Sequence, residues 1–158
     1  MRIDGWKVPV FGLVCLGLGT VGGITVADNN SKTAYVAPIT PDKMKFNPVD
    51  PKNPKGMQLA VLAGDPKTGP WAGEIKLPKG AAPIHWHSSD YYAVIVDGKS
   101  KHWLPSEDSA KAPTNPTGTF WFQPGGSEKT AHGDECMTDT CTILLVEPGK
   151  FDFTPVKK

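Results

Sequence analysis

Glycine and proline recur at short intervals along this chain, and that spacing constrains its fold more than any other feature. The 158 residues include 17 glycines and 16 prolines, which are spread from end to end rather than gathered in one segment. Both residues disfavour the interior of an α-helix, so this distribution excludes long helical bundles and coiled coils. The short apolar runs between them are typical of β-strands that end in tight turns.

These apolar runs predict an all-β domain. Each run is four to seven residues long and is closed by glycine, proline or aspartate: 57–63, 71–77, 84–87, 91–96, 101–104, 118–123 and 141–147. After residue 27, apolar side chains nowhere recur at helical spacing over three turns. We therefore expect about eight strands in a sandwich or barrel. Within the sixth run, Phe120, Trp121 and Phe122 should fill the core from both faces of a buried strand.

The first 27 residues have the outline of a secretory signal peptide. Arg2 and Lys7 precede 20 uncharged residues, Val8 to Ala27, and Asp28 begins a polar segment. We expect cleavage after Ala27, and an uncleaved membrane anchor or a buried core element are the alternatives. The predicted location is periplasmic or secreted, with no membrane contact after cleavage.

Three segments follow from this division. Residues 1–27 are the predicted signal peptide, residues 28–55 a polar, proline-punctuated arm, and residues 56–155 the β-domain. We expect the arm to be extended and to lie on the domain, because proline restricts both itself and the residue before it to extended conformations.

The charge balance argues against a nucleic-acid partner. The chain has 17 basic and 16 acidic side chains, and its only arginine is Arg2. Binding to nucleic acid draws mainly on clustered positive charge, which this composition lacks.

Two cysteines, Cys136 and Cys141, remain after the predicted cleavage. An even count in an exported chain favours a disulfide over two free thiols. In the chain-entropy model, closing so short a loop stabilises the protein by about 2 kcal/mol. A zinc cluster of His132, Cys136 and Cys141 is the alternative.

Two of the four histidines, His85 and His87, flank Trp86. Residues two apart on a strand point to the same face, so the two imidazoles lie side by side and Trp86 packs on the other side. Such a pair suits a divalent metal, although two surface histidines on an edge strand would show the same pattern. His132 follows a Pro-Gly-Gly turn at residues 124–126.

With these features together, the sequence resembles the cupin superfamily over residues 57–150. A cupin's first motif combines a glycine, His-x-His, a glutamate and a second glycine, and its second motif combines a glycine, Pro-x-Gly and a histidine. The matching residues are Gly80, His85, His87 and Gly98 for the first motif, and Gly118, Pro124, Gly126 and His132 for the second. A narrower resemblance is to the ChrR-like and DUF4437 cupins. It depends on four features: the Gly64-Asp65-Pro66 turn, the His85-Trp86-His87 motif, the paired cysteines after His132, and the C-terminal residues 149–153.

The chain departs from the cupin pattern at two places. Tyr91 occupies the position of the usual glutamate, with Asp90 one residue before it, and the gap from Gly126 to His132 is five residues where two are usual. On strand alternation, Tyr91 shares the inward direction of His85 and His87, and Asp90 does not. The carboxylate ligand of the family is therefore Asp90 only if the loop bends it inward.

The resemblance implies a single jelly-roll β-barrel with one divalent transition metal held by His85, His87 and His132. The metal would be zinc, iron, manganese, nickel or copper. Tyr91 is the candidate catalytic residue, with core filling as its alternative, and Asp90, His102 and Gln123 are further pocket candidates, although His102 among lysines could equally lie on the surface.

The implied function is metal-dependent chemistry on a small oxygenated or carbonyl compound, of oxidoreductase (dioxygenase) or isomerase type. A non-catalytic module that binds a small ligand or a metal is the alternative. A second alternative is a structural or interaction protein that forms homodimers through its N-terminal arm.

Overall fold

The computed structural model describes residues 38–157, and regular structure in this range is almost entirely β-strand. Two single 3₁₀ turns, η1 (Pro41–Lys43) and η2 (Glu128–Thr130), are the exceptions within these residues. The predicted all-β fold is thus confirmed. The predicted signal peptide and the first part of the arm lie outside the described residues.

Residues 38–157 contain ten strands: β1 (Asn47–Pro48), β2 (Gln58–Gly64), β3 (Trp71–Ala81), β4 (His85–Trp86), β5 (Tyr91–Asp97), β6 (Lys99–Trp103), β7 (Asn115–Pro116), β8 (Phe120–Gln123), β9 (Gly133–Glu147) and β10 (Thr154–Pro155). Each of the seven predicted runs contributes to one strand. The sequence did not indicate β1, β7 or β10, because two residues are too few for a pattern. β9 is longer than expected and begins at Gly133 rather than Cys141.

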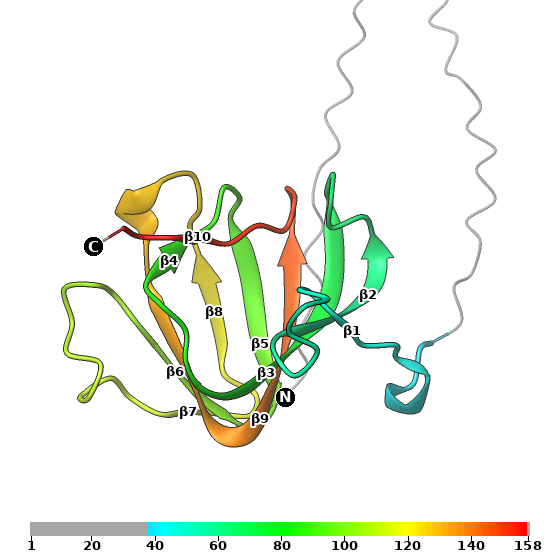
Figure 1. The fold of residues 1–158 in the computed structure, drawn as a ribbon, viewed down its shortest axis with the longest axis horizontal. Helices are drawn as coiled ribbons and strands as arrows, with labels where there is room; N and C mark the ends of the chain where they lie inside the picture. Colours follow the sequence, from blue (N-terminus) through cyan, green and yellow to red (C-terminus); the bar gives the residue numbers. More distant parts are fainter. Residues whose placement is uncertain (1–37, 158) are drawn as a thin grey trace, which may run out of the picture. The chain divides into compact units, whose positions relative to one another are not determined.

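Eight of these strands form one antiparallel sheet that folds around the core. Along its main path the order is β1-β2-β3-β9-β5-β8, and β6 pairs with both β7 and β9. The long strand β9 carries the bend, because residues 142–146 pair with β5 whereas residues 133–136 pair with β6. Figure 1 shows β9, in orange, curving from one layer to the other at the base of the strands.

β4 and β10 form a small second sheet near the other end of the strands. The C-terminal segment, red in Figure 1, crosses the strand ends there and brings Thr154 and Pro155 into register with Trp86 and His85. His85 is also bridged to His132 through two backbone hydrogen bonds of 3.0 and 2.8 Å. Two of the three candidate ligands are therefore fixed to each other through the main chain.

The hydrophobic core consists of the inward-facing side chains of β3, β5 and β9: Trp71, Ile75, Tyr91, Ala93, Ile143 and Leu145. The expectation that residues 120–122 are all core was wrong. Phe120 is 59% exposed and Phe122 is 47% exposed, whereas Trp121 is half-buried and packs against the core. β8 covers only one side of the core, so alternation turns every second side chain of this strand outward.

The part of the arm that is described, residues 38–55, is mostly exposed and runs to the edge of the sheet. There β1 pairs with β2, with Asn47 opposite Leu59. Among residues 38–157, no helix is long and apolar enough to cross a membrane.

Candidate metal centre

The fold brings His85, His87 and His132 together. Their ligand nitrogens all lie within 4.8 Å of one another, and the three residues are buried. His85 and His132 come together through the bridge between their backbones, and His87 lies two residues beyond His85. Trp86, between the two, is only half-buried, consistent with its predicted opposite direction.

The hydrogen bonds of the three imidazoles fix which nitrogen of each ring carries the proton. In every ring Nδ1 faces a backbone carbonyl oxygen: Pro83 for His85 at 2.8 Å, Asp152 for His87, and Thr130 for His132 at 3.4 Å. A carbonyl oxygen only accepts hydrogen bonds, so Nδ1 must be the N–H donor. The lone pair of each neutral ring is then on Nε2, which is the arrangement found in histidines that ligate metals.

Burial keeps these three rings neutral. It lowers the pKa of His85 and His87 below the usual value, and it lowers the pKa of His132 to about 3. The charge of Asp134 opposes this shift for His85 and His132 without outweighing it. Three neutral nitrogen donors suit a divalent transition metal and leave its charge uncompensated.

Asp134 completes the cluster and was not predicted from the sequence. Its Oδ2 lies 3.5 Å from His85 Nε2 and 3.4 Å from His132 Nε2. Burial favours the neutral acid, but the hydrogen bond and charge of His102 outweigh it and hold the pKa of Asp134 below its usual value. The missed signal was strand alternation, because Asp134 is two residues after His132 and so shares its face.

His102 and Gln123, which were pocket candidates, lie behind Asp134. His102 Nδ1 donates to Asp134 Oδ1 at 2.7 Å, and His102 Nε2 donates to Gln123 Oε1 at 3.0 Å. Burial alone would lower the pKa of His102, but these two acceptors raise it. His102 thus lies in the cluster, half-buried, rather than on the surface.

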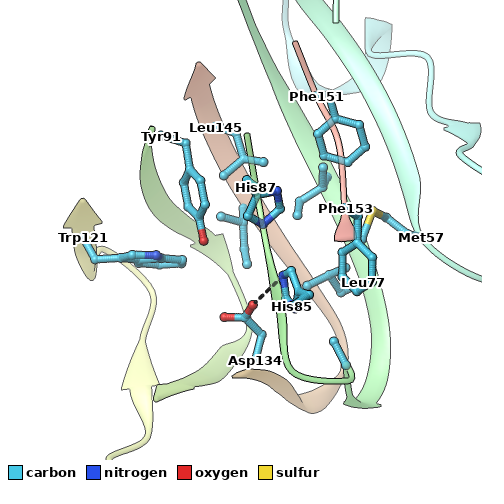
Figure 2. A pocket seen from close by; sticks show the side chains of 13 residues that line it. Met57, Leu77, His85, His87, Tyr91, Trp121, Asp134, Leu145, Phe151 and Phe153 are labelled. Carbon is cyan, nitrogen blue, oxygen red and sulfur yellow. Dashed lines mark ion pairs between the residues drawn. The ribbon is translucent and has the colours of Figure 1, made fainter. Parts of the chain in front are cut away.

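Tyr91 and Trp121 place two hydrogen-bond donors beside the histidines. The Tyr91 hydroxyl lies 3.2 Å from His132 Nε2, and burial raises the pKa of Tyr91 well above its usual value, so the hydroxyl stays protonated. Trp121 Nε1 is buried and has no hydrogen-bond partner among the described residues. Figure 2 shows both side chains directed toward the space in front of His85 and His87.

Asp90 does not belong to this cluster. Its Oδ1 accepts a hydrogen bond from the backbone N–H of Gly125 at 2.8 Å, and the residue is exposed. The loop after His87 therefore uses Asp90 to hold the Pro-Gly-Gly turn, and Asp90 is not among the described residues that line the cavity, so its pocket role stays a prediction.

The cluster forms the polar end of a small apolar cavity. Its walls include Leu77, Ile143 and Leu145 from the sheet and Phe151 and Phe153 from the C-terminal segment, as Figure 2 shows in part. The free volume is about 50 Å³, which is room for a few water molecules or the end of a small ligand. Phe153 stacks on His85 with ring centroids 4.0 Å apart and so limits the rotation of that ring.

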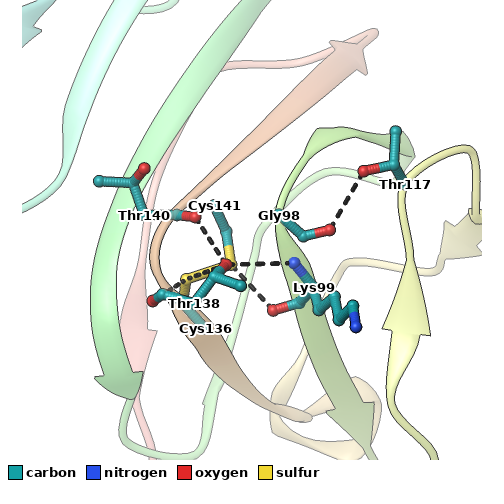
Figure 3. Close-up of a disulfide and its surroundings, with 7 residues drawn as sticks. All are labelled: Gly98, Lys99, Thr117, Cys136, Thr138, Thr140 and Cys141. Carbon is teal, nitrogen blue, oxygen red and sulfur yellow. Dashed lines mark hydrogen bonds between the residues drawn. A yellow bond between two sulfur atoms is a disulfide. The ribbon is translucent and has the colours of Figure 1, made fainter.

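The structure joins Cys136 and Cys141 in a disulfide. The bond closes a bulge in β9, where three residues lie opposite the single residue Lys79 of β3. Within the bulge Thr138 accepts a hydrogen bond from Lys99 N–H at 3.2 Å and donates one to Thr140 O at 2.7 Å, as Figure 3 shows. With their sulfurs bonded to each other, these cysteines have no thiolate for a zinc cluster with His132.

Comparison with solved structures identifies the architecture. An RmlC-like cupin from Shewanella frigidimarina matches with a TM-score of 0.51 and 17% identity, over 70% of this chain and 89% of its own. The chain has a cupin fold. The polyketide cyclase RemF from Streptomyces resistomycificus matches with a TM-score of 0.57 and 18% identity, over 78% of this chain and 87% of its own.

KdgF from Halomonas is a third structure with this fold. It matches with a TM-score of 0.53 and 21% identity, over 72% of this chain and 96% of its own. No protein-family model and no curated protein sequence matches the chain.

Proposed function

We propose that this protein is an exported cupin that binds one divalent transition metal through His85, His87 and His132 and uses it to act on a small oxygenated or carbonyl compound. The observation that carries the proposal is the orientation of the three rings. Each has Nδ1 committed to a backbone carbonyl, which leaves Nε2 with the free lone pair, and ligand nitrogens of the three residues lie within 4.8 Å of one another. Zinc, iron, nickel and copper all suit imidazole, and manganese suits a site that adds an oxygen ligand.

A divalent ion bound there would act as a Lewis acid on a substrate oxygen. The protonated hydroxyl of Tyr91 and the buried N–H of Trp121 lie beside this cluster and are placed to donate hydrogen bonds to the same oxygen. Donors aimed at an oxygen that gains negative charge stabilise the transition state, most effectively in a site shielded from water. The apolar walls around the cluster provide that shielding, and the small cavity limits which part of a substrate can enter.

The enzymatic proposal, of oxidoreductase or isomerase type, also draws on RemF, a solved structure with this fold that is an enzyme. Among the described residues that line the cavity, only Asp134 has a carboxylate. This carboxylate already accepts a hydrogen bond from His102. A cavity without a free general base also suits a protein that binds a small ligand or a metal without transforming it. That non-catalytic module is the second candidate.

Metal analysis tests the proposal. The full-length protein is expressed with its own N-terminus and no affinity tag, and its metals are measured by mass spectrometry. We expect one metal ion per chain in the wild type and loss of the metal in His85→Ala and in His132→Ala. A wild type without metal would overturn the proposal. Oxygen uptake and turnover of a panel of carbonyl compounds then separate the enzyme from the binding module, because only the enzyme converts a compound that it binds.

Export is part of the same proposal, and the N-terminus of the mature protein tests it. Cleavage after Ala27 predicts a chain that begins at Asp28 and is recovered outside the cytoplasm. The ChrR-like and DUF4437 group remains our proposal for the nearest relatives, on the residues that carry that resemblance. A homodimer, also part of the proposal, is measured by light scattering of the purified protein.

A further inference from the structure

Asp134 faces two nitrogens that cannot donate a hydrogen bond to it. Its Oδ2 is 3.5 Å from His85 Nε2 and 3.4 Å from His132 Nε2, yet the protons of both rings are on Nδ1, where carbonyl oxygens accept them. If the neutral ring of His85 carried its proton on Nε2 instead, the lone pair of Nδ1 would face the carbonyl oxygen of Pro83 at 2.8 Å. Two hydrogen-bond acceptors would then face each other. The cluster therefore gathers lone pairs beside a carboxylate, and the hydroxyl of Tyr91, 3.2 Å from His132 Nε2, can donate to one of them.

A cation removes this conflict, and the separations fit one. Ligand atoms about 2.1 Å from a tetrahedral ion are about 3.4 Å from one another. The distances from Asp134 Oδ2 to His85 Nε2 and to His132 Nε2 have this value, so Oδ2 lies at the separation expected between two ligands of one ion from each of these nitrogens. We propose that Asp134 is the carboxylate ligand of the metal centre, supplied from β9 in place of the glutamate whose position Tyr91 occupies. This inference rests on the proposed metal site.

A chain of hydrogen bonds holds Asp134 in this orientation. The amide nitrogen of Gln123 donates to Thr130 O at 2.7 Å and to Pro124 O at 3.2 Å, which turns Gln123 Oε1 toward His102. An amide oxygen only accepts, so His102 Nε2 must donate to it. His102 Nδ1 then donates to Asp134 Oδ1, and both ring nitrogens carry protons.

His102 is thus a positioning residue, and its cationic ring engages Oδ1 while Oδ2 faces the ligand nitrogens. A charge-assisted hydrogen bond of 2.7 Å restricts rotation of the carboxylate. Hydrogen bonds of this kind behind metal ligands orient them and contribute strongly to metal affinity. Asp90 precedes Tyr91, which occupies the position of the family's glutamate. The carboxylate of Asp90 instead accepts a hydrogen bond from the backbone N–H of Gly125.

Cobalt(II) binding tests the inference. Affinity is measured by competition with a chelating dye, and the visible absorption of bound Co²⁺ reports its ligand number and geometry. Asp134→Asn removes the charge with little change in size, and we expect Co²⁺ affinity to fall about 100-fold and the absorption spectrum to change. Asp90→Asn is the matched control and should bind Co²⁺ as the wild type does, with the same spectrum.

The outcomes separate this inference from the proposed function. A wild type that binds no Co²⁺ overturns the metal site itself. Wild-type affinity and spectrum in Asp134→Asn, with binding lost in His85→Ala, overturn only the role of Asp134. If circular dichroism shows that Asp134→Asn does not fold, His102→Leu serves instead, because it keeps all the ligands but removes the donor to Oδ1. We expect it to weaken Co²⁺ binding about tenfold or more, and unchanged binding overturns the inference.

Discussion

Two buried groups should give the metal-free protein opposite pH dependences of stability. Burial lowers the pKa of His132 to about 3 and raises the pKa of Glu147 to about 7. Glu147 is 1% exposed, and its Oε2 accepts a hydrogen bond from Trp71 Nε1 at 2.8 Å. Its Oε1 has no partner among the described residues, so the ionised form is poorly solvated.

The signs follow from comparing each folded pKa with the unfolded value. The pKa of His132 falls below 6.5 on folding, so its contribution is full above pH 6.5 and is lost on acidification. From about pH 8 to about pH 4 this loss is about 3 kcal/mol. The pKa of Glu147 rises above 4.5 on folding, so its contribution is full below pH 4.5 and is lost as the pH rises through 7. Over the same interval, acidification restores about 3 kcal/mol through Glu147.

Because the two effects nearly cancel, variants are needed to reveal them. Urea unfolding with excess chelator is measured across this pH range for the wild type, His132→Gln and Glu147→Gln. Relative to the wild type, His132→Gln should gain about 3 kcal/mol on acidification and Glu147→Gln should lose about 3 kcal/mol. A His132→Gln curve parallel to that of the wild type would refute the reasoning, since His132 would then not be held neutral with a free lone pair on Nε2.

Three further predictions concern the disulfide, a turn and the tyrosine. Replacing Cys136 and Cys141 together by serine should lower the free energy of unfolding by about 2 kcal/mol in urea, and no change would mean that the hydrogen bonds in the bulge suffice. Gly98→Ala should cost more than about 1 kcal/mol by the same assay, because Gly98 has φ of +87° and an added Cβ would lie 2.6 Å from Thr138 Oγ1; an unchanged midpoint would contradict that geometry. Tyr91→Phe should retain the metal, as measured by mass spectrometry, but should lower the turnover rate about 100-fold. An unchanged turnover rate would exclude proton donation by Tyr91.

Local patterns were sufficient to predict the all-β fold and the inward direction of Tyr91. They failed where distant pairing decides the structure. Residues 133–140 are mostly polar and lie outside the predicted strands, yet they form the first half of β9 because β3 and β6 pair with them from either side. The prediction that Phe120 and Phe122 lie in the core was wrong for a different reason. Their apolar character did not reveal that β8 has an exposed outer face.

Asp134 illustrates the same limit within the candidate site. Alternation placed it on the face of His132, but its role depends on the register between β6 and β9, which sets it opposite His102. That register brings together an aspartate and a histidine 32 residues apart, and no pattern within either strand indicates it. A metal centre requires ligand atoms at suitable positions in space, whichever strand supplies them. A carboxylate on β9 can therefore take the place of a carboxylate on β5. A sequence motif with fixed spacing shows that the glutamate is missing at the position of Tyr91, but it does not show which residue elsewhere in the chain replaces it.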